Sequence, residues 1–392
     1  MDFEYTEAQR LFRQELRDWL SVNHPGFSDD RIGENPDRGW EKREAWDRKL
    51  YEGGYTSGIS WPVRYGGRGA SVIDQLIVYQ EMARAQVPGE LGRGARQILG
   101  PTIIRFGTED QKARFLPSTL RGDIRWCQGF SEPGAGSDLA GLRTAARIDG
   151  DELVISGQKT WTSLAHRADW CFLLVRTDQS APKHKGISFV LVDMRSPGIS
   201  VRPFRTCVGE SDFCDVFFDD VRVPLGNAVG ELHDGWNVTR IALSHERATM
   251  ALSRYLIHQL EVSDFADLLA QCADRLTPQQ LQRADEALGR ALVASEQARL
   301  TGYWNVSHML RGEEMGAKGS VLKVHFSQLT QQLSEAAMDL LGLAAMTTDP
   351  EVGQLGEKWF RAFLASRASG IYGGTVEIQR NIIAEQLIGL PR

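Results

Sequence analysis

Four short apolar runs, rich in β-branched and aromatic residues, constrain the possible folds of this 392-residue chain more than any other feature. They occupy residues 152–157, 170–176, 187–193 and 215–221. Turn-forming residues separate the runs, and Asp149-Gly150-Asp151 is a hairpin signal directly before the first of them. Because the runs follow one another too closely for helices between them, we predict a small antiparallel barrel or sandwich rather than a parallel sheet.

Helical patterns lie on both sides of this β region. Before about residue 122, apolar residues recur at helical spacing, first over residues 7–20, where Thr6 can cap the helix. Further helices are predicted at 40–52, 71–85, 97–106 and 110–116. After Gly235, the segments near 236–260, 279–311, 317–342 and 352–369 are long enough for a bundle. We therefore predict an α+β fold of three domains: an N-terminal all-α domain (1–122), a middle β-domain (123–232) and a C-terminal helical bundle (233–392).

Composition argues against several classes of protein. The formal net charge of −6 is unlike that of a nucleic-acid-binding protein, which would show a basic surface. The five cysteines include no CxxC pair, so neither a disulfide framework nor a zinc site is indicated. There is no HExxH, GxSxG or P-loop motif. No window has the roughly 18 apolar residues of a membrane helix, and the first 20 residues lack an apolar signal core, so we expect a cytoplasmic protein.

A turn of small residues, Ser131-Glu132-Pro133-Gly134-Ala135-Gly136-Ser137-Asp138, precedes the strand-like runs. Its small residues leave the backbone bare, so that an anion can approach the N–H groups closely, and its two serines add hydroxyls. The turn is therefore a candidate cradle for a phosphate or pyrophosphate. The alternative is that it is only a turn.

Glu246 is the carboxylate best placed for acid–base chemistry. Its neighbours at helical spacing are Ala242, Leu243, Thr249 and Met250. A carboxylate on such an apolar stripe is partly desolvated, which raises its pKa toward the range of a general base. The alternative is a buried glutamate satisfied by Arg247 or Arg254.

Two further segments have residues that suit a cofactor. In Gly157-Gln158-Lys159-Thr160-Trp161-Thr162-Ser163, the indole of Trp161 could stack on a flat cofactor, or it could be an ordinary buried core residue. Near the C-terminus, paired glycines precede Thr375, which can cap a final helix whose N-terminus favours an anion. Taken alone, that segment is only a helix start.

Together these segments resemble the acyl-CoA dehydrogenase family over nearly the whole chain. The EPGAGSD core of the first turn, the GQK…W segment and Tyr372-Gly373-Gly374-Thr375…Gln379-Arg380 occur in the order and spacing of that family. The resemblance implies an N-terminal helical domain, a middle β-domain and a C-terminal four-helix bundle. It also implies FAD between the β-domain and the bundle, and an oligomer, a dimer or a tetramer, in which a neighbouring subunit completes each flavin site.

The resemblance assigns roles by position. The residues that would contact the cofactor are Gln128, Phe130, Ser131, Gly136, Ser137, Trp161, Ser163, Thr375 and Glu377. Trp161 would pack on the isoalloxazine, and Ser163 would reach its N5/O4 edge. The residues that would contact the substrate are Ser137, Arg247, Tyr372 and Gly373.

The implied reaction is the α,β-dehydrogenation of an acyl-CoA to a trans-2-enoyl-CoA. A carboxylate takes the α-proton, a hydride leaves the β-carbon for flavin N5, and an electron-transferring flavoprotein receives the electrons. Many relatives have the catalytic glutamate directly after the tyrosine of the C-terminal motif, where this chain has Gly373. A smaller group, similar to isovaleryl- and long-chain acyl-CoA dehydrogenases, has it on the first long bundle helix before an arginine, as in Glu246-Arg247. We therefore assign the base to Glu246.

Two departures from the family pattern narrow the subgroup. The RxxFG stretch is absent from residues 263–281, and the QxxGGxG stretch is altered at residues 338–344. Dehydrogenases of actinobacterial steroid catabolism, several of them α2β2 tetramers, are similar in this respect. A bulky or branched, steroid-derived acyl group and a second, related subunit are therefore expected. The rival interpretations are a flavin-dependent oxidase or monooxygenase of the same fold and a non-catalytic subunit of a heteromeric dehydrogenase.

Overall fold

The computed structural model describes residues 4–27, 39–313, 315–346 and 353–391, with the backbone alone for residues 247–252 and 353–355. The chain divides into two compact units. The β unit contains residues 35–71 and 88–246, and the bundle unit contains residues 1–34, 72–87 and 247–392. This division by packing differs from the three predicted domains, whose boundaries remain a prediction.

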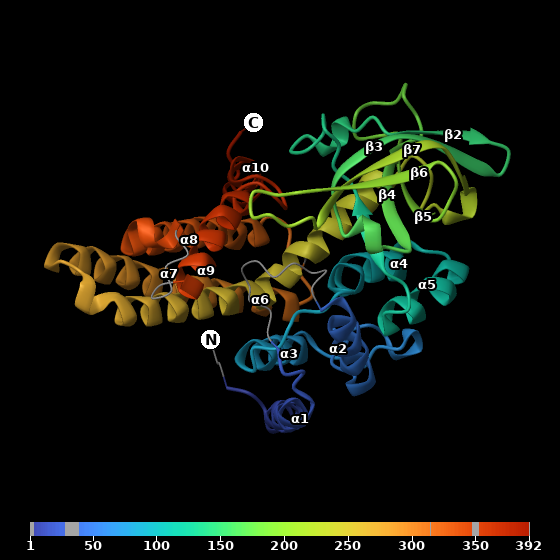
Figure 1. The fold of residues 1–392 in the computed structure, drawn as a ribbon. Coiled ribbons are helices and arrows are strands. Elements are labelled where there is room, and N and C mark those ends of the chain that lie inside the picture. Colours follow the sequence, from blue (N-terminus) through green and yellow to red (C-terminus); the bar gives the residue numbers. More distant parts are fainter. Residues whose placement is uncertain (1–3, 28–38, 314, 347–352, 392) are drawn as a thin grey trace. The chain divides into compact units, whose positions relative to one another are not determined.

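The β unit is built on one seven-stranded sheet (Figure 1). Its strands are β1 (Trp126–Gly129), β2 (Ala145–Asp149), β3 (Glu152–Ser163), β4 (Trp170–Arg176), β5 (Ile187–Asp193), β6 (Ile199–Phe204) and β7 (Phe213–Pro224). The order is β1-β4-β2-β3-β7-β6, and β5 pairs with β4 off this path. The four predicted runs are β strands, and the predicted hairpin joins β2 to β3, with Gly150 at φ +64° in the turn.

The sheet is not wholly antiparallel, so that prediction is wrong for two strand pairs. The pairs β2–β3, β3–β7, β4–β5 and β6–β7 are antiparallel. In contrast, β1 lies parallel to β4, and one residue of β2 pairs in parallel with β4. Between β1 and β4 the chain forms the turn at 131–138 and the β2–β3 hairpin, and so long a connection lets the chain return in the same direction.

Two hydrophobic cores cover the two faces of the central strands. The middle of β4 and β5 is buried on both faces, and successive residues of β4 alternate between the two cores. Phe172 and Leu174 belong to the core that also contains Phe115 of α5 (Glu109–Arg121), whereas Cys171 and Leu173 belong to the other. The first core therefore joins the sheet to the helices of this unit.

The helices of the β unit are α2 (Trp40–Gly53), α4 (Gly100–Phe106), α5 and the first part of α6 (Gly235–Cys272). The left-handed Gly54, φ +74°, caps the end of α2, and its N–H donates to the carbonyls of Leu50 and Tyr51. The prediction that the helix at 110–116 ends before Pro117 is wrong, because α5 continues to Arg121. Leu116, Thr119 and Leu120 on either side of the proline are buried, and this burial outweighs the loss of one backbone hydrogen bond.

The bundle unit is helical (Figure 1). It contains α1 (Glu7–Asn23), α3 (Val72–Arg84), the rest of α6, α7 (Pro278–Leu310), α8 (Lys318–Leu341), α9 (Gly353–Ser369) and α10 (Val376–Ile382). Thr6 caps α1 as predicted, in a capping box with Gln9. The helix α6 is longer than predicted, because the buried residues Val262, Phe265 and Leu268 continue its apolar face beyond residue 260. Within the described part of the chain, no helix has the length and apolar character needed to span a membrane.

Candidate functional site

The turn at residues 131–138 is a tight hairpin anchored at one point in the core. Glu132 and Ala135 exchange two backbone hydrogen bonds, both of 3.0 Å, across Pro133-Gly134. The methyl group of Ala135 is buried in the core that contains Phe130. Ala135 therefore packs into the core, and only the two glycines of the turn, Gly134 and Gly136, leave the backbone bare as predicted.

The glycines of this turn are not required by the chain's own packing. Neither Gly134 nor Gly136 has a positive φ, and a Cβ added to either would meet no protein atom within 4 Å. Both residues are exposed, as is Ser137. A ligand that approaches the backbone closely would need such open space, so this geometry favours the cradle over the simple turn.

A buried ion pair fixes the turn to strand β3. The Lys159 ammonium, with 0% of its side chain exposed, donates to Glu132 Oε1 at 2.8 Å and to the Phe130 carbonyl at 3.0 Å. Glu132 also accepts from the backbone N–H groups of Arg143 (2.7 Å) and Thr144 (2.9 Å). The ion pair therefore connects four parts of the chain. They are the residue that follows β1, the turn itself, the segment that precedes β2, and strand β3.

The electrostatics of the pair follow from burial and from these partners. Burial by itself would raise the pKa of Glu132, but Lys159 and the two N–H donors lower the pKa below its ordinary value. Burial lowers the pKa of the Lys159 ammonium, although Glu132 opposes that shift. Removal of either partner would leave the other charged group buried without its counter-charge.

Lys159 and Glu132 lie in the two segments predicted to suit a cofactor, but no role was predicted for either side chain. Alternation along β3 gave only a weak signal. Lys159 shares its parity with the buried Leu153 and Ile155, but Gly157 between them is exposed and the pairing register shifts there. A buried lysine requires an acceptor, and the turn at 131–138 contains two carboxylates, Glu132 and Asp138.

Trp161 lies on β3 at a break in strand register, and the alternative that it is an ordinary buried core residue is wrong. The pairing of β3 with β7 shifts between Lys159 and Thr162. At this irregularity Trp161 has φ +58°, and the residue is 58% exposed. A left-handed conformation is costly for a bulky residue, and together with the exposure it marks Trp161 as a functional candidate.

Two aromatic residues that the sequence analysis missed support the Trp161 ring. Phe204 and Phe213 lie edge-to-face against it, with ring centroids 5.0 Å and 5.5 Å away. They face one another across β6 and β7. The Thr160 N–H donates to the Ser131 carbonyl at 3.0 Å, so the exposed indole is connected through one residue to the turn. Ser163 is exposed two residues beyond the indole.

Gln128 and Phe130, the remaining predicted cofactor contacts of this unit, differ in how accessible their side chains are to a ligand. Gln128 is half-buried on β1. The Phe130 side chain packs in the core, edge-to-face with Phe172 at 5.7 Å and Phe189 at 6.0 Å. Its ring is therefore not available to a ligand, and Phe130 can contribute only through its backbone.

Glu246 lies on α6, where its sequence pattern predicted a helix. It follows the fully buried Ala242 by about one helical turn and is itself half-buried. The side chain of Arg247 lies outside the described residues. Arg254, named as a possible partner of Glu246, lies over the Phe326 ring, with Cζ 4.4 Å from the ring centroid.

The C-terminal motif belongs to the bundle unit. Thr375 caps α10 as predicted, accepting from the Ile378 N–H at 3.2 Å. Gly373 has φ +65°, and its carbonyl accepts from the side chain of Gln379 at 2.9 Å. Tyr372 and Glu377 are exposed, and Lys323 Nζ lies 4.1 Å from the centroid of the Tyr372 ring. These residues belong to the bundle unit, whereas the turn at 131–138 belongs to the β unit.

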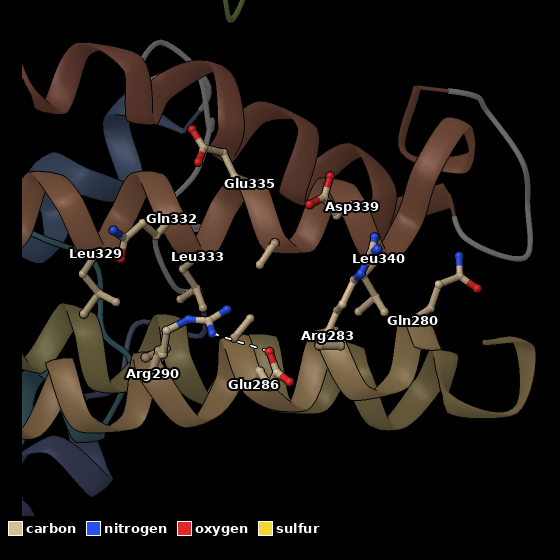
Figure 2. A pocket seen from close by; sticks show the side chains of 14 residues that line it. Gln280, Arg283, Glu286, Arg290, Leu329, Gln332, Leu333, Glu335, Asp339 and Leu340 are labelled. Carbon is tan, nitrogen blue, oxygen red and sulfur yellow. Dashed lines mark ion pairs between the residues drawn. The ribbon is translucent and has the colours of Figure 1, made fainter. Parts of the chain in front are cut away.

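A groove of about 620 Å³ lies elsewhere in the bundle unit, between the first half of α7 and the second half of α8 (Figure 2). No predicted site residue lines it. Its walls carry both charges, including Arg290 and Glu286, which lie 3.8 Å apart. Asp339 and Leu340, from the altered stretch at residues 338–344, also line it. We assign this groove no part in the chemistry.

Known protein families and structures are similar to this chain over nearly its whole length. Three models of the acyl-CoA dehydrogenase family match: the N-terminal domain at residues 6–123, the middle domain at 127–221 and the C-terminal domain at 233–388. The acyl-CoA dehydrogenase IpdE1 of Mycobacterium tuberculosis is 40% identical over 388 residues, which cover 97% of each chain.

Solved structures agree with this result. The Tcur3481–Tcur3483 steroid ACAD superimposes with a TM-score of 0.84 at 31% identity, over 100% of both chains. The ChsE4–ChsE5 complex of Mycobacterium tuberculosis has a TM-score of 0.81 at 32% identity, also over 100% of both chains. These likenesses confirm the predicted fold class of helical N-terminal region, middle β-domain and helical C-terminal region.

Proposed function

Because the chain belongs to the acyl-CoA dehydrogenase family, we propose that it catalyses the FAD-dependent α,β-dehydrogenation of an acyl-CoA to a trans-2-enoyl-CoA. The observation that carries this proposal is the turn at 131–138, which is open at Gly134 and Gly136 and is held by the Lys159–Glu132 pair. The exposed Trp161 lies two residues beyond Lys159 on the same strand. A bare backbone beside an exposed aromatic face suits a cofactor with both a pyrophosphate and a flat ring system.

The residues present fit FAD. The open N–H groups and hydroxyls of Ser131, Gly136 and Ser137 would hold polar parts of the cofactor, and Trp161 would offer its exposed face to the ring system. Gln128, Phe130 through its backbone, Ser163, Thr375 and Glu377 are the further proposed contacts. When bound, FAD supplies the acceptor for the hydride that leaves the substrate's β-carbon.

The protein's own contribution to the reaction is proton transfer and orientation. Glu246 would take the proton from the substrate's α-carbon, and its half-buried position on α6 supports a carboxylate that is partly desolvated. Hydrogen bonds from the turn would orient the thioester and stabilise the negative charge that develops on its carbonyl oxygen. Ser137, Arg247, Tyr372 and Gly373 are the proposed substrate contacts.

The proposed substrate is a bulky or branched acyl-CoA, and a steroid-derived ring fragment is the class we favour. The support is the likeness to the Tcur3481–Tcur3483 protein, whose name describes it as a steroid ACAD. That protein and ChsE4–ChsE5 are complexes of two different chains, so a related second subunit is proposed here as well, in an α2β2 assembly, with a homo-oligomer as the alternative. An electron-transferring flavoprotein is the proposed acceptor, and the cytoplasm the proposed location.

The first experiment is the visible absorption spectrum and solution mass of the chain purified alone. Stoichiometric flavin absorbance on a homo-oligomer would show that the chain completes its own FAD site. A colourless protein that becomes yellow only after co-expression with a related subunit would show an obligate heteromer. Reconstitution that never yields flavin in either form would refute the proposed cofactor.

The second experiment separates dehydrogenase from the rival functions. Anaerobic bleaching of the flavin by an acyl-CoA, with slow re-oxidation in air, identifies a dehydrogenase, whereas rapid peroxide formation identifies an oxidase. Glu246→Gln should retain flavin and acyl-CoA binding but lose flavin reduction by about 10²–10⁴-fold. The same change at exposed Glu286 of α7 is the matched control. Reduction by Glu246→Gln at the control rate would remove Glu246 from the mechanism and assign the α-proton to another base. Failure of every acyl-CoA to reduce the flavin of the unmodified protein would favour a non-catalytic subunit.

A further inference from the structure

A buried lysine of the bundle unit contacts the C-terminal motif. Lys323 of α8 is 2% exposed. Its ammonium donates to the Ser369 carbonyl at 2.5 Å and lies 4.1 Å from the centroid of the Tyr372 ring. Burial of a charged group is costly unless polar or aromatic partners compensate for it. The charge therefore lies where α9 ends and the segment that contains Tyr372 begins.

The first of these contacts fixes the end of α9. Ser369 is the last residue of this helix, so its carbonyl has no hydrogen-bond partner further along the helix. Lys323 and Ser327 of α8 both donate to this carbonyl, Ser327 from its hydroxyl at 2.7 Å. A positive charge is also favourable at the C-terminal end of a helix dipole. Two donors of α8 therefore hold the residue that precedes the motif segment.

The segment that follows α9 has little rigidity of its own. Gly373 and Gly374 both have a positive φ, +65° and +89°, and glycine can leave such a conformation at little cost. The Val376 N–H donates to the Gly370 carbonyl at 3.0 Å, which closes the turn through its backbone. The position of the Tyr372 ring therefore depends on what the ring itself contacts.

The second contact of Lys323 holds the Tyr372 ring. A cation within about 6 Å of the centroid of an aromatic ring is attracted to the ring face, most strongly where water is excluded. The buried ammonium of Lys323 meets both conditions. Tyr372 is nevertheless 44% exposed, so part of its side chain is accessible to a ligand. The ring is therefore held by a buried charge and still open to a substrate.

We propose that Lys323 is a positioning residue, which holds Tyr372 and Gly373 where they contact the acyl-CoA. The inference rests on the proposed function and adds a residue that acts on the substrate only through others. The charge of Lys323 holds the Tyr372 ring, and its hydrogen bond to Ser369 holds the backbone three residues earlier. The alternative is that Lys323 only stabilises the end of α9.

Lys323→Met tests whether the lysine holds this segment. Methionine removes the charge but keeps an unbranched side chain, and the Ser369 carbonyl keeps its hydrogen bond from Ser327, so the variant should fold. Lys358→Met is the matched control, since Lys358 lies on α9 and pairs with Asp264 at 3.2 Å. By hydrogen exchange, peptides that contain residues 369–376 should exchange at least about fivefold faster in Lys323→Met than in the wild type or the control.

Ligand binding tests whether the held segment serves the substrate. The probes are octanoyl-CoA, isobutyryl-CoA and 3-cyclohexylpropanoyl-CoA, with the flavin-loaded enzyme in whichever assembly retains flavin. We measure the Kd of the corresponding 2-enoyl-CoA products by calorimetry and the maximal rate of flavin reduction by each ester. For the ligand that the wild type binds most tightly, Lys323→Met should raise Kd about 10-fold. The maximal rate should change by less than about threefold, because the proposed base, Glu246, remains in place.

A double-mutant cycle tests whether Lys323 acts through the ring. Tyr372→Leu removes the ring, and the variant should fold because this side chain is partly exposed. In the Tyr372→Leu background, Lys323→Met should change Kd by less than about threefold, because the ring that it positions is already absent. Tyr372→Phe retains the ring, so in that background Lys323→Met should still raise Kd about 10-fold.

Three outcomes would overturn the proposal. The first is unchanged exchange of residues 369–376 in Lys323→Met. The second is faster exchange without a change in Kd, which would leave Lys323 a purely stabilising role. The third is an equal loss of affinity with and without the Tyr372 ring. If the 2-enoyl-CoA ligands bind but no ester reduces the flavin, the proposed function fails, while the Kd values still decide the role of Lys323.

Discussion

Replacement of Lys159 by methionine is the most direct test of how the cradle is held. The substitution removes the counter-charge of Glu132 in a site where Lys159 is fully buried. Breaking a buried ion pair by removal of one partner costs about 3–5 kcal/mol. Glu132 would keep its hydrogen bonds from the N–H groups of Arg143 and Thr144. We therefore expect Lys159→Met to lower the free energy of unfolding by about 3 kcal/mol, the lower limit of that range.

The assay is a double-mutant cycle of urea unfolding with Lys159→Met, Glu132→Gln and the double variant. The double variant should be more stable than Lys159→Met alone, because it removes the unpaired buried charge. Lys183→Met is the matched control. Lys183 pairs with Asp138 of the same turn, but the two side chains are 50% and 63% exposed, so this pair should contribute less than about 1 kcal/mol.

The pH dependence has a defined sign. The pKa of Glu132 is held below its ordinary value of 4.5, so the pair contributes stability above that pH, and this stability is lost as the pH falls through the folded-state pKa. In Lys159→Met the buried carboxyl can be protonated more easily. The difference in unfolding free energy between wild type and variant should therefore shrink as the pH is lowered from 7 to about 4.

The functional readout is flavin retention, since a loosened turn should release the cofactor faster. The reasoning is refuted if Lys159→Met is no less stable than Lys183→Met at pH 7. It is also refuted if the difference from wild type grows on acidification.

Three other predictions concern single positions. Gly136→Ala should weaken FAD binding at least about tenfold with unchanged far-UV circular dichroism, because the added Cβ meets no protein atom within 4 Å and would obstruct only a ligand. Equal affinities in a flavin titration would contradict this. Trp161→Gly should weaken FAD binding but change the unfolding free energy of the flavin-free protein by less than about 1 kcal/mol, because relief of the left-handed strain offsets the lost ring contacts. A large loss of stability without a change in flavin affinity would assign Trp161 to the core. Gly374→Ala should lower the urea concentration at the unfolding midpoint, because φ is +89° and the new Cβ would come within 2.4 Å of Gln379 Nε2. A midpoint equal to that of the wild type would show that the C-terminal segment has another conformation.

Local patterns predicted the local structure well. The hairpin at Gly150, the cap at Thr6 and the helix that contains Glu246 each depend on residues within a few positions of one another. Such features could be read from the sequence because the interactions that stabilise them are short-range.

Errors arose where the decisive partner was distant. The parallel pairing of β1 with β4 depends on how the chain returns to the sheet, and the continuation of α5 through Pro117 depends on tertiary burial of its apolar face. The sequence likewise did not indicate that the ring of Phe130 packs against Phe172 and Phe189 on β4 and β5, which leaves only its backbone for the predicted cofactor contact.

The candidate site shows the same distinction. The sequence by itself determined which residues are present: a bare turn, an indole three residues after a glycine-glutamine pair, a carboxylate on a helix and a glycine pair before a capped helix. Only the tertiary structure decided that Lys159 and Glu132, 27 residues apart, pair in the interior, and that a break in register turns Trp161 outward. The physical reason is that burial and register are properties of the assembled sheet, so the energy of a charge or an indole at these positions depends on neighbours that local sequence does not specify.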